Sequence, residues 1–177
     1  NYKHLWHRGF PVELINHRDA KILKKKKIKV DIQADFWDGD PDIDAICRMM
    51  YKPICKFNKN IFPFFSDKLS PFNTQNTFID AKLLKNYFLF PDQGRIHDIW
   101  SSYFVQYHNK NINVVYNKAS VFQRRNSHNL ITDLKNEFNG LKNNFRFLNL
   151  MFKRKFNYKK EFSKRSIEAY KEYKKHF

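Results

Sequence analysis

The chain has 177 residues, a length that fits one domain with one hydrophobic core. Apolar residues make up 42% and aromatic residues 18%, so there is ample side-chain surface to bury and disorder of the whole chain is excluded. Lys and Arg number 34 against 17 Asp and Glu, which gives a formal net charge of +17. This balance suits a polyanion, a phosphorylated substrate or an acidic membrane surface as a partner.

Targeting and redox signals are few. No apolar run approaches the ~18–20 residues that a membrane span needs, and no signal-peptide pattern opens the chain. Cys47 and Cys55 match neither a CxxC pair nor a disulfide framework, which predicts a reducing compartment, the cytoplasm. Because the chain starts at Asn1 and enters an apolar segment at once, we expect the start of a longer protein to lie upstream.

The first part of the chain predicts one strand and one helix. A Gly-Phe-Pro turn signal lies in residues 5–15, and the run Lys24–Lys27 predicts a solvated surface, with an anion site as the less favoured alternative. Residues 28–35 alternate apolar and polar side chains, as a strand with one buried face does. Asp40 is placed to cap a helix over 41–51.

The middle of the chain predicts shorter elements. Residues 61–65 read as a buried extended piece, and the polar loop 70–78 becomes a strand around 76–79. Asp80 is placed to cap a helix over 81–88.

The rest of the chain predicts three helices and one strand, in this order: a turn at 91–95, a helix over 98–107, a strand over 112–116, a helix over 130–138 and a last helix near 160–175. Either Ser127 or Asn129 caps the helix at 130. Residues 141–177 hold twelve Lys and Arg against three Glu, so we expect a basic helical tail after a domain over 1–140. Alternating strands and helices predict an α/β or α+β domain.

Two acidic segments are candidates for chemistry. Asp38-x-Asp40 presents carboxylates as hard-metal sites do, but helix capping explains this turn better. In the turn that precedes the helix at 98, Arg95 and Asp98 stand together, and such a placement suits a general base. In the alternative interpretation Asp98 is a helix-terminal carboxylate and Trp100 a core anchor, and the sequence does not decide between the two interpretations.

Two polar segments are candidates for binding. The loop with Asn73, Gln75 and Asn76 is rich in amides beside aromatic residues, a composition that grips sugar hydroxyls but also satisfies turns. The cations that follow the last strand suit a phosphate or diphosphate; their alternative is a solvated basic face, which composition alone favours. These side chains are Lys118, Arg124, Arg125 and His128.

Four segments in a fixed order, Arg8–Pro11, Ala34–Arg48, Pro71–Thr77 and Gly94–Trp100, resemble the STELLO-type glycosyltransferase-like family. The resemblance covers roughly residues 5–135. It extends more distantly to the reversibly glycosylated polypeptides, the UDP-arabinopyranose mutases. The mutases carry Asp-Tyr-Asp-Ala, an Asn-bearing strand, Arg-Tyr-Asp-Asp-Met-Trp and Lys-Ala-Ser in one order, and their counterparts here are Asp42–Ala45, Asn76, Arg95–Trp100 and Lys118–Ser120.

The resemblance implies the acceptor-side, C-terminal part of a glycosyltransferase-A fold, a partial mixed sheet with flanking helices. The family's metal-binding Asp-x-Asp would lie before Asn1, so we expect a divalent metal, Mn²⁺ or Mg²⁺, for the complete enzyme and none held by this chain. Two departures weaken the match, because His97 replaces the first acid of the Asp-Asp pair and Tyr116 replaces a His of the mutases. No counterpart exists for the basic tail.

The expected function is transfer of a sugar from a nucleotide-sugar donor to an unidentified acceptor. Asp98 would be the base and Arg95 would contact the donor phosphate or position Asp98. The acceptor side would be lined by Asn73, Gln75, Asn76 and Trp100, and the diphosphate would face Arg124, Arg125 and His128. The rivals are a nucleic-acid or polyanion-binding module that uses the basic tail, and a non-catalytic relative that uses the fold for assembly.

Overall fold

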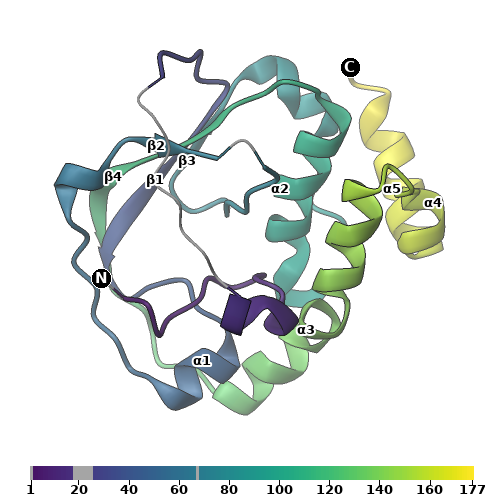
Figure 1. Cartoon of the computed structure of the whole chain (residues 1–177). Helices are drawn as coiled ribbons and strands as arrows, with labels where there is room; N and C mark the ends of the chain where they lie inside the picture. Colours follow the sequence, from purple (N-terminus) through teal and green to yellow (C-terminus); the bar gives the residue numbers. More distant parts are fainter. Residues whose placement is uncertain (1, 18–25, 67) are drawn as a thin grey trace.

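A computed structural model describes residues 2–17, 26–66 and 68–177 (Figure 1). Its four-stranded mixed sheet has the strand order β2-β4-β1-β3. The central strands β1 (Ile32–Gly39) and β4 (Val114–Gln123) pair in parallel, and the short edge strands β2 (Phe64–Phe65) and β3 (Thr77–Ile79) pair antiparallel to them. The expected α/β class with flanking helices is therefore confirmed.

Helices gather on one side of the sheet, where Figure 1 shows α2, α3, α4 and α5 together. The α-helices are α1 (Ala45–Met50), α2 (His97–His108), α3 (Leu130–Phe152), α4 (Tyr158–Glu161) and α5 (Lys164–Lys174). The 3-10 helices are η1 (Val12–His17), η2 (Lys59–Ile61), η3 (Ala81–Asn86) and η4 (Gly94–Ile96). In the lysine run that we expect at the surface, Lys24 and Lys25 lie outside the described residues.

The two central strands run further toward their carboxyl ends than the sequence pattern predicts. The expected strand over 28–35 begins and ends four residues later, and the one over 112–116 extends to Gln123. Pairing between them sets these ends, because Ile32 lies opposite Val114 and Gly39 opposite Gln123. The alternation of side chains could not show this extension, since the register shifts between Asp35 and Trp37.

The expected cap of the first helix is wrong. Asp44, not Asp40, precedes α1, and its side chain accepts a hydrogen bond from the backbone N–H of Cys47 at 2.9 Å. Asp40 instead pairs with Arg48 at 2.7 Å, so the residues before Asp44 stay in a loop and α1 is shorter than expected.

Two other caps are confirmed. Asp80 accepts from the backbone N–H of Lys82 at 3.0 Å, although the helix it begins is the 3-10 helix η3. Asn129, rather than Ser127, caps α3 by accepting from Thr132 N–H at 3.0 Å. Local capping chemistry is therefore readable in this sequence where one polar residue stands directly before an apolar run.

The C-terminal segment is helical and basic, but it shares the core of the protein. The expected boundary after residue 140 falls inside α3, which runs without a break for 23 residues. Phe147 stacks on Trp100 with ring centroids 4.4 Å apart, and Phe162 stacks on Phe90 at 4.0 Å. The lysines and arginines of 141–177 stay exposed while these aromatic rings complete the largest hydrophobic cluster.

Close packing fixes α3 against η4. A Cβ added to Gly140 would lie 2.7 Å from Cγ1 of Ile96, closer than real Cβ contacts, so the helix backbone rests directly on that side chain. Just N-terminal to this contact, α3 turns two buried carboxylates, Asp133 and Glu137, toward Arg95.

Replacing Phe147 by Ala is expected to lower the free energy of unfolding by about 3–5 kcal/mol, because a buried ring stacked on Trp100 leaves a cavity. The same change at Phe152, which is 57% exposed on the same helix, is expected to stay within about 0.5 kcal/mol. Urea unfolding of both variants measures the difference; equal effects would contradict the placement of the C-terminal segment in the core.

Candidate functional site

A cavity of about 320 Å³ opens between the sheet and the N-terminal segment. Residues 2–7, β1 and the loops around 41–43 and 71–73 supply its walls. The aromatic part of the wall consists of Tyr2, Trp6, Phe36, Trp37, Phe57, Phe64, Phe72 and Tyr116. Such a concave, largely apolar surface with few polar groups is typical of a ligand site.

Asp35, in the middle of β1, is among the residues that line this cavity. It is 7% exposed, and the side chain of Gln33 donates to its Oδ1 at 2.7 Å. The irregularity lies in β4, because Asp35 and Trp37 of β1 are opposite Asn117 and Val121, which leaves two extra residues in β4. Residues 34–37 of β1 all contribute to the cavity lining.

Asp42 supplies a second carboxylate, but its oxygens are already bonded. Arg8 Nε donates to Oδ1 at 2.9 Å and Nη2 donates to Oδ2 at 3.0 Å, while Asn73 Nδ2 donates to Oδ2 at 2.7 Å. Burial by itself would raise the pKa of Asp42, but the positive charge of Arg8 outweighs it and holds the pKa far below its usual range. Asp42 is therefore a fixed anion that orients the amide of Asn73.

Arg8 joins the loop before α1 to the start of α2 by bridging the carboxylates of Asp42 and Asp98. Beside the two bonds to Asp42, its Nη1 and Nη2 each donate to Asp98 at 2.8 Å, and Nη1 also donates to the carbonyl of Arg95. Burial would lower the pKa of Arg8, but the two carboxylates raise it well above its usual value, so the guanidinium stays charged.

Gly9 explains how Arg8 reaches this position. Its φ of +87° is in the region that favours glycine, and a Cβ there would lie 2.4 Å from Cγ2 of Ile99. The turn after Arg8 can therefore press against α2, next to Asp98. No other residue type fits at position 9 without moving one of the two segments.

The predicted catalytic pair lies behind the cavity wall. Asp98 is 6% exposed, accepts both bonds from Arg8 and is not among the described residues that line the cavity. Arg95 turns toward α3, where Nη1 pairs with Asp133 at 2.8 Å and Nε with Glu137 at 3.0 Å. In this arrangement both side chains hold neighbouring elements together.

One of the four predicted acceptor residues lines the cavity. Asn73 is in the wall, whereas Gln75 is exposed beside it and donates its backbone N–H to Asn73 Oδ1 at 3.1 Å. Asn76 joins β1 to β4 by donating to Phe36 O at 3.2 Å and to Ser120 Oγ at 2.8 Å. Trp100 lies in the helical core, where it stacks on Phe147.

The predicted phosphate-binding residues are not gathered into one site. Arg124 is exposed, and His128 Nδ1 lies 3.0 Å from Asp133 Oδ2. Arg125 lies deeper, with Nε 3.5 Å from Asp40 Oδ1 and Nη2 3.8 Å from Asp42 Oδ1. Burial lowers the pKa of Arg125, and the charge of Arg48 adds to the effect.

The acidic turn does not fit a metal ion. Asp38 accepts from the backbone N–H of Phe57 at 2.9 Å, and Asp40 pairs with Arg48. Among residues 2–17, 26–66 and 68–177, no group of three or more His, Cys, Asp or Glu side chains is arranged to hold a metal. In the same part of the chain, no helix has both the length and the apolar character to cross a membrane.

Sequence reasoning missed Arg8 and Asp35 as site residues. Arg8 stands in a Gly-Phe-Pro turn signal, which identifies the turn but not the two carboxylates that the guanidinium meets far along the chain. Asp35 ended an alternating run, so it read as the end of a strand. That β1 continues past Asp35 could be predicted only from its pairing with β4.

No family model matches the chain, and a search of curated proteins finds no significant match. The geometry of the cavity and of its polar groups is therefore the basis for a functional proposal.

Replacing Arg8 by Met is expected to lower the free energy of unfolding by about 3–5 kcal/mol at neutral pH, because two buried carboxylates lose their partner. With Arg8, Asp42 contributes stability that is present above its unfolded pKa and is lost as pH falls below ~4. Without Arg8, burial disfavours the ionised carboxylate, so the penalty is largest near neutral pH and shrinks on acidification.

Urea unfolding of the wild type and Arg8→Met between neutral pH and pH ~4 measures this difference, with the exposed Arg124→Met as the matched control. A difference that stays constant with pH would show that the loss comes from packing rather than from the ion pairs.

Proposed function

We propose that this cavity binds a sugar and that the domain carries the acceptor side of a glycosyltransferase. The observation that supports this most is the cavity wall, which combines aromatic residues with Asp35 and Asn73. The C–H faces of a sugar pack on aromatic rings, and its hydroxyls hydrogen-bond to carboxylates and amides. A wall of this composition can contact both the C–H faces and the hydroxyls of a sugar.

Within this proposal, Asp35 takes the part of general base. Asp35 is among the cavity-lining residues and its Oδ1 accepts from Gln33, whereas both oxygens of Asp98 accept from Arg8 and Asp98 is not among the described lining residues. A base within hydrogen-bond reach accepts the hydroxyl proton as the oxygen attacks the donor sugar, and the nucleotide diphosphate leaves. The sequence-based predictions of Asp98 as the base and Arg95 as a donor-phosphate contact stay untested; in the present proposal Asp98 instead has a positioning role, through Arg8 and Asp42.

The remaining parts of the proposal rest on the resemblance to the STELLO-type family. A nucleotide-sugar would be the donor, and the site for it, with Mn²⁺ or Mg²⁺, would lie upstream of Asn1. The cytoplasmic location is part of the same proposal and rests on the cysteine pattern of the sequence.

Asp35→Asn is expected to lower kcat by roughly 10²–10⁴-fold with little change in stability, because the isosteric amide cannot accept the proton. Transfer is measured as UDP or GDP release by the full-length gene product, with UDP-glucose, UDP-galactose and GDP-mannose as donors in the presence of Mn²⁺. Asp98→Asn is the comparison: as a positioning residue it is expected to lower Tm together with activity, because Arg8 loses a partner.

The matched control is Asp92→Asn, an exposed carboxylate on the loop before η4 whose φ of 66° suits Asn. Binding of free monosaccharides to the chain, followed by saturation-transfer NMR, tests the cavity independently of turnover. The proposal fails if Asn73→Ala leaves sugar binding intact, and the base assignment fails if Asp35→Asn keeps wild-type kcat.

A polyanion-binding module remains the second candidate, since all twelve Lys and Arg of residues 141–177 are exposed. Such a module is expected to bind a short oligonucleotide with an affinity that falls steeply between low and physiological salt. Calorimetric titration at two salt concentrations measures it; binding that is insensitive to salt would contradict a backbone-contact mode.

A further inference from the structure

The outward face of α3 carries a row of large apolar side chains open to solvent. They stand seven residues apart, and their exposed fractions are 70% for Ile131, 61% for Phe138, 41% for Phe145 and 57% for Phe152. Because seven residues are close to two helical turns, the row drifts by only ~20° at each step and follows one side of the helix. The four side chains are called the α3 row below.

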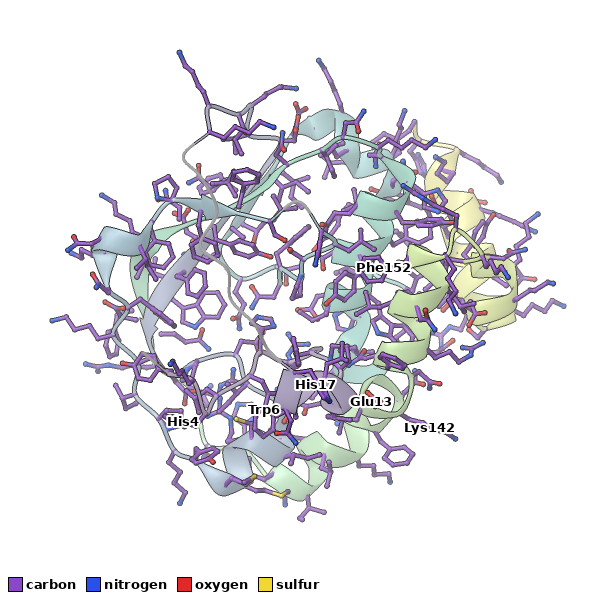
Figure 2. All side chains as sticks on the ribbon, in the orientation of Figure 1. His4, Trp6, Glu13, His17, Lys142 and Phe152 are labelled. Carbon is purple, nitrogen blue, oxygen red and sulfur yellow. The ribbon has the colours of Figure 1, made fainter. Side chains whose placement is uncertain are left out.

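The charges on this helix are sorted between its two sides. The acidic residues of α3, Asp133 and Glu137, are buried and face the core. The charged side chains that α3 exposes are all cations, namely Lys135, Lys142 and Arg146, and of these Arg146 pairs with Glu161 of α4 at 2.6 Å. Lys142 and Phe152 both lie on this helix in Figure 2. The solvent-facing part of α3 therefore combines aromatic rings with positive charge and no exposed carboxylate of its own.

The pattern does not suit a second helix. A helical partner interlocks with two alternating rows of side chains, and here the second row would be Leu134, Leu141 and Leu148, which is half-buried to buried. A second copy of the chain would bring like charges together, since the net charge is +17. A partner for this face must accept protruding rings without matching holes and must be negatively charged.

We propose that the α3 row binds the surface of an anionic membrane. A bilayer interface accepts apolar side chains without shape complementarity, and acidic headgroups attract cations that flank them. Lys135 and Lys142 stand four residues after Ile131 and Phe138, so each lies about one turn along from a row member, at headgroup level when the row inserts. The 23-residue helix is ~35 Å long and would lie along the interface.

The test is sedimentation of the chain with vesicles of phosphatidylcholine alone and of phosphatidylcholine mixed with phosphatidylserine. We expect binding to the mixed vesicles only, weakened by added salt. The double variant Phe138→Gln/Phe152→Gln is expected to reduce the affinity by roughly ten-fold or more, since each substitution removes an apolar ring that would otherwise be buried in the bilayer interface. The variant Lys135→Gln/Lys142→Gln is expected to weaken the dependence on phosphatidylserine.

The matched control is Phe78→Gln, which removes a ring that is 67% exposed on the edge strand β3. It is expected to bind like the wild type, and circular dichroism and Tm confirm that all variants fold. The proposal is overturned if the wild type does not bind phosphatidylserine vesicles, or if the row variants bind as well as the Phe78→Gln control. It is also overturned if the row variants abolish self-association of the chain while vesicle binding stays unchanged.

Discussion

The buried guanidinium of Arg8 is the interaction on which the arrangement of the candidate site depends. It holds the loop before α1 through Asp42 and the start of α2 through Asp98, and these segments are separated by more than fifty residues in the sequence. A buried cation between two carboxylates is costly to desolvate and is tolerated only with complete hydrogen bonding. Arg8 meets this condition with bonds to both carboxylates and to the carbonyl of Arg95.

A chain of polar contacts extends from this centre into the helical side of the protein. Arg95, whose carbonyl accepts from Arg8, uses its own side chain to hold Asp133 and Glu137 of α3. Glu137 in turn accepts from the backbone N–H of Ala45 at 2.7 Å, at the start of α1. The site loops, α1 and α3 are thus joined by charged groups, while the aromatic cluster behind them supplies the apolar burial.

Local chemistry was predictable from the sequence, and long-range pairing was not. The α/β class, the caps Asp80 and Asn129 and the helix after Arg95 follow from patterns within a few residues. The extension of β1 to Gly39 depends on its pairing with β4. Asp44 rather than Asp40 caps α1, and Asp40 forms an ion pair with Arg48. The aromatic residues of the C-terminal segment gave no sign that they complete the core, because their partners stand far back in the chain.

The contact between Gly140 and Ile96 gives a helix position remote from the cavity an influence on it. Any side chain at 140 would wedge α3 away from η4 and carry Asp133 and Glu137 with it. Arg95 could then not keep both its ion pairs with Asp133 and Glu137 and the hydrogen bond that its carbonyl accepts from Arg8. The lack of a side chain at position 140 thus sets how α3 is placed relative to η4 and to the hydrogen bonds of Arg8.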